Sequence, residues 1–374
     1  MPVSAKSTAW LALALSALAA FSLTGGAASG VVSAASDPAT PRFHQTALLL
    51  GDNRVLIAGG MRANGAVEAS AELYDPAASR FLPLPGMHVA RVGAVAARLP
   101  NGDVLIAGGS DGRSCLSSAE IYDAAHRRFR SGVAMHVPRC SAQAFVLKNG
   151  AVLVAGGSTS SDDGQLATAE LYDPRIDAFT QTGSLRVPRS AFAGAVLRDG
   201  RVLVTGGWSA GTYPARTIEK SAEIYDPANG RFSPAGSMTV ERYKMAAVRL
   251  KDGRVLVIGG SDARDWQGIS NTTEIYDPAT RRFTAAAFMR FARFKLPDGA
   301  VLLDDGKVLV VGGAARAEIY DPAANAFAPA GGVALDGFYF STATKLANDQ
   351  TLIVGGCGED PGAGAVRHAW LYRP

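Results

Sequence analysis

The chain has 374 residues, of which 42 are glycine and 19 % are charged, and its formal net charge is +4. A chain of this length would ordinarily divide into two or three domains, unless it consists of repeats. Abundant glycine, modest charge and short β-branched runs are typical of an all-β chain with many tight turns, and they exclude a helical or disordered one. So small and scattered a charge gives no support for a nucleic-acid partner.

The N-terminal segment has a composition of its own. Lys6 precedes the apolar run "AWLALALSALAAFSL", and small residues follow it. A charged start, an apolar run too short to span a bilayer and a small-residue exit are typical of a secretory signal peptide. We therefore expect residues 1–28 to be removed, an uncleaved anchor being the alternative, and the mature chain to be secreted or periplasmic with no membrane span. Cleavage near Ala28 is favoured over cleavage after Ala35, because the later cut would destroy a strand expected there.

Double glycines recur seven times after an aliphatic run, and their starts are 49, 48, 50, 53, 53 and 43 residues apart. They are Gly59-Gly60, Gly108-Gly109, Gly156-Gly157, Gly206-Gly207, Gly259-Gly260, Gly312-Gly313 and Gly355-Gly356. An Arg opens six of the units, 17 residues before the first glycine in five of them and 19 residues before it in the sixth. A Tyr in each of these six units precedes a Phe by 7 residues, as in Tyr74 and Phe81. The units span about 42–88, 89–136, 137–186, 187–239, 240–290, 291–334 and 335–374, the last completed by 29–41.

The period near 50 residues, the "VLVxGG" runs and the later Tyr resemble kelch repeats from about residue 30 to the end of the chain. The chain is thus similar to bacterial secreted kelch-motif proteins, whose fold is shared with the central domain of galactose oxidase. Unit 4 reads as four strands, "SAFAGAVL", "RVLVTGG", "SAEIYDP" and "GRFSPAGSM". Asn-Gly or Asp-Gly in five units predicts that a two-residue turn closes the first hairpin. We expect residues 29–374 to form one all-β domain, a seven-bladed β-propeller.

The seventh unit contains only three of the four strands. In the other units the repeat Phe precedes the next opening position by ten residues, and counting ten back from Arg42 lands on Val32. We therefore expect residues near Val31–Ser36 to pair with the third strand of blade 7. This N-terminal strand would close the ring and remove an exposed edge.

The opening Arg and the Glu of "AExYD" start at the same end of a blade, with the double glycine between them. We expect each pair to form a structural ion pair across a slot left by the glycines. The six pairs are Arg42–Glu72, Arg91–Glu120, Arg139–Glu170, Arg189–Glu223, Arg242–Glu274 and Arg293–Glu318. Unit 7 lacks both partners and has Gly337 and Trp370, as expected if a buried partner left alone is costly. The alternative is an anion-binding ring of arginines around the funnel, as in some kelch proteins.

Catalytic and metal motifs are scarce. Galactose-oxidase-like enzymes hold copper with Tyr and His, but the five histidines here form no pair at metal-ligand spacing on one strand. They are His44, His88, His126, His136 and His368. We expect no cofactor or metal, and we find no phosphate loop, no nucleophile elbow and no catalytic residue to name. Cys115 and Cys140, in neighbouring units, are the candidate disulfide, which leaves Cys357 free.

The connection between the second and third strands is the variable part of the repeat. From the first glycine to the repeat Tyr it measures 15, 14, 16, 19, 17, 8 and 17 residues, so recognition is expected on these loops. We predict a ligand site between blades 4 and 5 made of Trp208, Tyr213, Tyr243, Lys244, Arg264 and Trp266. The alternative is that these aromatic residues only pack the loops.

The resulting functional prediction is a monomeric binding or interaction module that recognises a glycan or an extracytoplasmic protein through this loop face. The alternative is a carbohydrate-active enzyme that resembles the periplasmic kelch mutarotases or another epimerase. Such an enzyme needs an unpaired acid or base in the funnel, and the sequence names none. A copper radical oxidase is the least favoured prediction.

Overall fold

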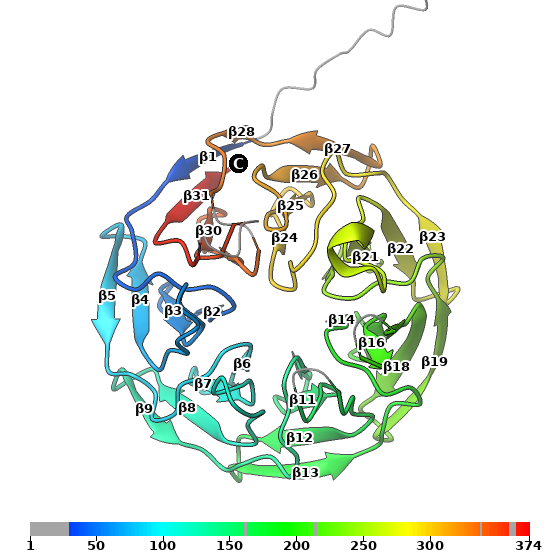
Figure 1. The fold of residues 1–374 in the computed structure, drawn as a ribbon, viewed down its shortest axis with the longest axis horizontal. Coiled ribbons are helices and arrows are strands. Elements are labelled where there is room, and N and C mark those ends of the chain that lie inside the picture. The colour runs from blue at the N-terminus through cyan, green and yellow to red at the C-terminus, as the bar shows by residue number, and fades with distance from the viewer. Residues whose placement is uncertain (1–29, 161–162, 213–214, 337–338, 359–363) are drawn as a thin grey trace, which may run out of the picture.

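The structure, a computed structural model, describes residues 30–160, 163–212, 215–336, 339–358 and 364–374. Seven sheets of four or five strands surround a central channel, with the innermost strand of each sheet beside the channel (Figure 1). The predicted all-β, seven-bladed β-propeller is confirmed. The blades are numbered 1 to 7 in chain order, so that each blade has the number of the sequence unit that forms it.

Within blades 1 to 6 the strands are antiparallel and follow the chain from the channel to the rim. Blade 1 holds β2 (Thr46–Leu49), β3 (Val55–Ala58), β4 (Ala71–Asp75) and β5 (Arg80–Leu84). Blade 2 holds β6 (Val95–Arg98), β7 (Val104–Ala107), β8 (Ala119–Asp123) and β9 (Arg128–Ser131). Blade 3 holds β10 (Gln143–Val146), β11 (Val152–Ala155), β12 (Ala169–Asp173) and β13 (Ala178–Thr182).

Blades 4 to 7 continue the pattern with small departures. Blade 4 holds β14 (Ala193–Val196), β15 (Val202–Thr205), β18 (Ser221–Asp226) and β19 (Arg231–Ser237). Blade 5 holds β20 (Ala246–Arg249), β21 (Val255–Ile258), β22 (Thr273–Asp277) and β23 (Arg282–Ala285). Blade 6 holds β24 (Ala300–Leu302), β25 (Val308–Val310), β26 (Glu318–Asp321) and β27 (Ala326–Pro329). Blade 7 holds β29 (Thr342–Lys345), β30 (Thr351–Val354) and β31 (Ala369–Arg373), and it is completed by β1 (Val31–Ala34) and β28 (Gly331–Gly332).

The N-terminal strand closes the ring as predicted. β1 pairs antiparallel with β31, with Val31 opposite Arg373 and Ala34 opposite Trp370, so the first and last strands lie side by side (Figure 1). On its other side β1 pairs in parallel with the two-residue strand β28, which the sequence did not predict. Val32 is only 2 % exposed, because its side chain packs between blades 6 and 7. Closure therefore depends on both pairing and burial.

The first hairpin of a blade has a longer turn than predicted. In blade 2 the N–H of Gly102 donates to the carbonyl of Leu99 (2.9 Å), and the N–H of Leu99 donates to the carbonyl of Asp103 (2.8 Å). These bonds enclose the three-residue loop 100–102, in which Gly102 has a φ of +91° and Asn101 has no positive φ. A two-residue hairpin turn requires a positive φ at its first residue, so that prediction is wrong. The glycine is needed at the last loop position instead.

The double glycines are explained by backbone packing. Gly59 and Gly60 have φ values of +68° and +97°, which favour glycine. A Cβ on Gly59 would lie 2.4 Å from the carbonyl oxygen of Arg91, and a Cβ on Gly60 would lie 2.9 Å from that of Phe43. The N–H of Gly60 donates to the same Arg91 carbonyl (2.9 Å), which ties blade 1 to blade 2. The expected slot for an Arg and a Glu side chain is thus filled by the backbone of Arg91 in the next unit and of Phe43 in the same unit.

The hydrophobic core lies between neighbouring blades. The ring centroids of Tyr74 and Phe81 lie 5.0 Å apart, and Tyr74 is 1 % exposed. In the next blade, Tyr122 and Phe129 pack against Leu56 of blade 1. The repeated Tyr and Phe therefore serve packing between blades, which is why every unit with an outer Phe strand repeats them.

Extra structure is concentrated in two connections on one face. The β15–β18 connection of blade 4 carries a small hairpin, β16 (Trp208–Ala210) and β17 (Thr217–Ile218). The β21–β22 connection of blade 5 carries the 3₁₀ helix η1 (Asp265–Gly268). Across the described ranges, no helix has the length and hydropathy that crossing a membrane requires.

Candidate functional site

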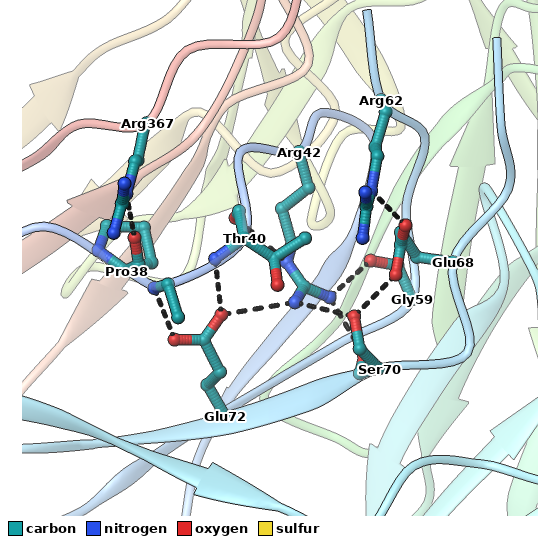
Figure 2. A network of polar contacts seen from close by, with 10 residues as sticks. Pro38, Thr40, Arg42, Gly59, Arg62, Glu68, Ser70, Glu72 and Arg367 are labelled. Carbon is teal, nitrogen blue, oxygen red and sulfur yellow. Dashed lines mark hydrogen bonds and ion pairs between the residues drawn. The ribbon is translucent and has the colours of Figure 1, made fainter. Parts of the chain in front are cut away.

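The Arg–Glu pair of blade 1 illustrates the six buried joints at the start of the units (Figure 2). Arg42 Nη2 lies 3.2 Å from Glu72 Oε1, while Nη1 donates to the carbonyls of Gly59 (2.7 Å) and Ser70 (2.8 Å). Glu72 also accepts the N–H groups of residues 39 and 40 at 2.7 and 3.1 Å. The guanidinium and the carboxylate therefore each form several hydrogen bonds, and the pair joins the segment that precedes β2 to β4.

The same joint recurs in the next five units. The N–O distance is 3.1 Å in Arg91–Glu120, Arg139–Glu170, Arg189–Glu223 and Arg242–Glu274, and 2.9 Å in Arg293–Glu318. All six arginines are at most 1 % exposed. Buried guanidinium groups that donate to backbone and carboxylate do not face a ligand, so the alternative of an anion-binding arginine ring has no geometric support.

Blade 7 replaces the charged pair with an apolar contact. Trp370 is 4 % exposed and packs between blades 6 and 7 in the cluster that contains Val32. The bridge of Tyr339 to Cys357 matches the bridge of residues 43 and 61, which places the position equivalent to the opening Arg at 338. This is one residue later than the sequence spacing placed it, and both 338 and Gly337 lie outside the described residues.

Two of the predicted ligand-binding aromatics are covered. Trp208 is 5 % exposed, with the Arg216 guanidinium 4.5 Å from its ring centroid. Tyr243 is 0 % exposed, and its hydroxyl accepts a hydrogen bond from Arg216 Nη1 (3.1 Å). Because neither ring has an exposed face on which a ligand could stack, Trp208 and Tyr243 serve packing rather than direct contact with a ligand. Arg216, which the sequence reasoning missed, forms the layer above them.

The other predicted residues divide between the rim and the channel. Trp266 of η1 is 47 % exposed at the rim, and Lys244 lines the central channel. Arg264 is exposed and forms an ion pair with Asp262 at 2.5 Å, so its charge is already partnered within its own loop. Tyr213 lies outside the described residues. Trp266 and Lys244 thus remain as candidates for direct contact.

A ring of residues with positive φ surrounds the channel mouth, each two residues after an opening position. We call it the mouth ring: His44, Gly93, Ser141, Ala191, Lys244, Lys295 and Phe340. Backbone hydrogen bonds link its members from blade to blade. For example, Lys244 donates to Ala191 (2.8 Å), Phe340 donates to Lys295 (2.8 Å) and His44 donates to Phe340 (3.1 Å). The fixed offset from the opening Arg was visible in the sequence, and it would have found Lys295 and His44 together with Lys244.

Two lysines of the mouth ring stand among aromatic rings. Lys295 Nζ lies 3.7 Å from the ring centroid of Trp266, and Lys244 Nζ lies 4.8 Å from that of Tyr243. Burial lowers the pKa of Lys244 to about 8, an effect that the Lys295 charge reinforces and Asp265 opposes. Burial likewise lowers the pKa of Lys295. Neither ammonium has a carboxylate at ion-pair distance within the described part of the chain, in contrast to the six arginines.

His44 lies in the mouth ring with the two lysines, but its imidazole is uncharged. Its ring stacks on Phe340, with centroids 4.3 Å apart. Burial, followed by the charges of Lys244 and Lys295, lowers the pKa of His44 to about 4, so the ring is neutral at physiological pH. A neutral imidazole can donate to or accept from a ligand.

Below the mouth ring, the innermost strands enclose a channel cavity of ≈ 200 Å³. Its wall is mostly small side chains of β2, β6 and β10, with Pro297, Asp298 and Lys244 from blades 5 and 6. The Asp298 side chain is exposed to the channel, and within the described residues no hydrogen bond or ion pair reaches its carboxylate. Loss of hydration inside the channel raises the pKa of Asp298 to about 6.

The cysteines lie on the loop face. Cys115 and Cys140 form a disulfide between blades 2 and 3, with their Cα atoms 5.2 Å apart. Cys357 is a half-buried free thiol. In the described ranges, no group of three or more His, Cys, Asp or Glu side chains is arranged to hold a metal ion. Copper chemistry therefore finds no ligand set among these residues.

Comparison with known proteins agrees with this architecture. Residues 189–239 and 242–289 match the Kelch motif family. Blades 4 and 5 of this β-propeller therefore carry the Kelch motif. No curated protein matches the chain. Among solved structures, the chain is similar to a fungal alcohol oxidase of the AA5 family in complex with copper. The TM-score is 0.71 and the identity 19 %, over 92 % of this chain and 76 % of that one. At that identity the likeness shows the shared fold alone.

Proposed function

We propose that this kelch propeller is a binding module that recognises an acidic glycan at the mouth of its central channel. The observation that carries the proposal is the pair of lysines of the mouth ring, Lys244 and Lys295, whose ammonium groups have no carboxylate at ion-pair distance within the described residues. Charged groups that are not used by the fold are available to a ligand of opposite charge.

The surroundings of these lysines favour an anion that carries a sugar ring. Arg216, Lys244 and Lys295 bring three positive charges to the mouth, and among the described residues the carboxylate of Asp265 lies near them and forms an ion pair with Arg216. The exposed Trp266 beside Lys295 offers an aromatic face at the same place. Aromatic faces next to cations suit carboxylate-bearing sugars through stacking and charge-assisted hydrogen bonds.

The rim is low on one side of this mouth, which would admit a chain end. The connection from β25 to β26 in blade 6 has only seven residues, 311–317, whereas the equivalent connection in blade 5 has fourteen, 259–272. A glycan chain could therefore reach the channel over blade 6. An acidic protein segment could take the same route, and the binding test separates the two.

The binding test compares three probes by isothermal titration: an oligogalacturonate, the neutral oligogalactose and an oligoglutamate peptide. We expect the oligogalacturonate to bind best, and Lys244→Met with Lys295→Met to weaken it about tenfold or more. Lys148→Met is the matched control, because Lys148 is exposed beyond β10 at the opposite end of the strand. Equal binding of the neutral sugar, or a folded double variant with full affinity, would contradict the proposal. Preferential binding of the peptide would make the partner a protein.

We also propose that the mature protein is monomeric and works outside the cytoplasm, in the periplasm or beyond. The Cys115–Cys140 disulfide supports this compartment, because disulfides persist in oxidising surroundings. The segment that resembles a signal peptide, 1–28, lies outside the described residues. Cell fractionation with N-terminal sequencing of the mature protein, and light scattering for its mass, would test these statements.

A second candidate function is a carbohydrate enzyme that works by proton transfer, such as a mutarotase or epimerase. The observation in its favour is Asp298, an unpartnered carboxyl group in the channel with a pKa near 6. That pKa suits a general base at neutral pH. Following sugar anomerisation by NMR with the wild-type protein and Asp298→Asn tests this candidate, and identical rates for the two proteins would rule it out.

A further inference from the structure

The channel wall departs from its sevenfold pattern at one place in blade 6. The first glycine follows the opening Arg by 19 residues there, against 17 in the five preceding units. Lys295 keeps its mouth-ring position with a φ of +57°. Ala300 pairs with Val310, and the N–H of Gly299 donates to Val311 (2.7 Å), so the strand register is regular again from Gly299 onward. The two additional residues therefore lie within 296–298.

This insertion places a carboxylate in the channel. Leu296 is fully buried, whereas Pro297 and Asp298 line the cavity. The backbone carbonyl of Asp298 accepts the N–H of Ala343 (2.9 Å), and the N–H of Leu296 donates to the carbonyl of Lys244 (3.4 Å). The segment is thus held between blades 5 and 7, and Asp298 is fixed in the wall below the two lysines.

The cavity now has two chemically different ends. Lys244 lines its mouth, with the charge of Lys295 nearby in the mouth ring, and its wall carries the Asp298 carboxylate, which forms no hydrogen bond or ion pair with the described side chains. A volume of ≈ 200 Å³ is below the roughly 300–1,000 Å³ of sites for drug-sized ligands, so it admits about one sugar ring. An unsatisfied carboxylate in such a space favours a partner that donates hydrogen bonds.

We propose that the channel binds a two-ended ligand, a sugar acid whose carboxylate meets Lys244 and Lys295 while its hydroxyl groups donate to Asp298. This inference rests on the proposed function and names the ligand class of the same site. The sugar acid can be free or stand at the end of a glycan chain. The carboxylate sets the orientation, because the reversed ligand would place two carboxylates side by side in the channel.

The test is isothermal titration with glucuronate, its 1-O-methyl glycoside, glucose and cyclohexanecarboxylate. Glucuronate has both ends, whereas glucose lacks the carboxylate and cyclohexanecarboxylate lacks the hydroxyl groups. We expect glucuronate to bind about tenfold or more tightly than either. Binding of the methyl glycoside as tightly as glucuronate supports a chain end as the source, and binding of glucuronate alone supports the free acid.

Asp298→Asn is the decisive variant. It should weaken glucuronate about tenfold and leave cyclohexanecarboxylate unchanged, while Lys295→Met weakens both. If Asp298→Asn fails to fold, Asp298→Ser replaces it in the same measurement, after thermal unfolding has shown that this variant is folded. An Asp298→Asn protein that binds glucuronate like the wild type overturns this inference and leaves the proposed function standing. If neither acid depends on Lys295, the proposed function falls and the inference falls with it.

The pH dependence supplies a readout that a merely structural role would not move. Asp298 becomes protonated between pH 7 and 5, because its pKa is about 6. The other titratable groups of the wall hold their state, since the pKa of His44 is about 4 and that of Lys244 about 8. Wild-type affinity for glucuronate should fall between pH 7 and 5, and the affinity of Asp298→Asn should not. An equal pH dependence in both proteins would overturn the assignment.

Discussion

The six buried joints and the mouth ring use the same kinds of side chain in opposite ways. At a joint, each Arg is at most 1 % exposed, lies within 3.2 Å of a Glu and donates to backbone carbonyls as well. At the mouth, the ammonium groups of Lys244 and Lys295 contact aromatic rings and form no ion pair with a carboxylate of the described residues. The Arg and Glu charges that repeat with the units therefore stabilise the fold. Asp298, a charge that breaks the repeat, has no ion pair within the described residues, and our proposal assigns it to a ligand.

The largest effect should come from removing the strand that closes the ring. A chain that begins at Asp37 lacks β1, which pairs with both β31 and β28 and buries Val32. We expect it to lose more than about 5 kcal/mol of unfolding free energy relative to a chain that begins at Gly30, beyond the usual cost of one substitution. Thermal unfolding by circular dichroism measures this. Equal melting temperatures would show that β1 contributes only at the margin.

The next prediction sets a joint directly against the mouth. Glu223→Gln leaves the buried Arg189 without its charged partner and should cost about 3–5 kcal/mol, whereas Arg189→Met with Glu223→Met should recover much of this. Lys295→Met is the control, and its effect should stay within about 1 kcal/mol. Denaturant unfolding measures all three. If Glu223→Gln is as mild as Lys295→Met, the joints do not stabilise the fold in the way their burial implies.

Acid should weaken the joints only at a pH below the one at which Asp298 in the channel becomes protonated. Burial tends to raise the pKa of Glu120, but hydrogen bonds from His88 and Val89 and from Arg91 together hold it below its usual value. A folded pKa below the unfolded one stabilises the protein fully above the unfolded value, about 4.3, and this contribution is lost as pH falls through the folded pKa. Unfolding free energies measured between pH 7 and 3 should therefore drop below about pH 4. Glu120→Gln should reduce that drop, and an unchanged slope would contradict the explanation.

The sequence predicted the fold better than the site, for physical reasons. Spacing in the chain determines strand pairing within a unit, so the blades and the closing strand could be derived from the Gly-Gly and Tyr–Phe registers. The same reasoning named Trp208 and Tyr243 as ligand contacts, but a side chain's exposure depends on what folds over it, here Arg216. The contact of His44 with Phe340 exists only because the ring closes. The turn type failed because Asn-Gly suits both a two-residue turn and the last position of a longer loop.

The smallest effect concerns the stability cost of the unpaired carboxylate. The channel raises the pKa of Asp298 to about 6, whereas an unfolded Asp has a pKa of about 3.9. A raised carboxyl pKa means that the folded state disfavours the ionised form. Asp298 therefore lowers stability above about pH 6, and this deficit disappears as pH falls towards 4. Asp298→Asn should raise the unfolding free energy at pH 7.5 by less than about 1 kcal/mol, because the Asp298 side chain is exposed to the channel and the charge of an exposed group is partly screened.

Asp304 of the same blade provides the matched control for that prediction. Asp304 is exposed, and its ion pair with Lys345 lowers its pKa. Asp298, in contrast, has no ion pair among the described residues and a raised pKa. Asp304→Asn should lower the melting temperature slightly at pH 7.5, whereas the same substitution at Asp298 should raise it. Thermal unfolding at pH 7.5 and 4 measures the sign of each change. A gain at Asp298 would mean that the fold retains a destabilising charge, which is expected of a residue kept for a ligand rather than for packing. A loss at both positions would place Asp298 with the structural charges and remove the distinction between the joints and the channel.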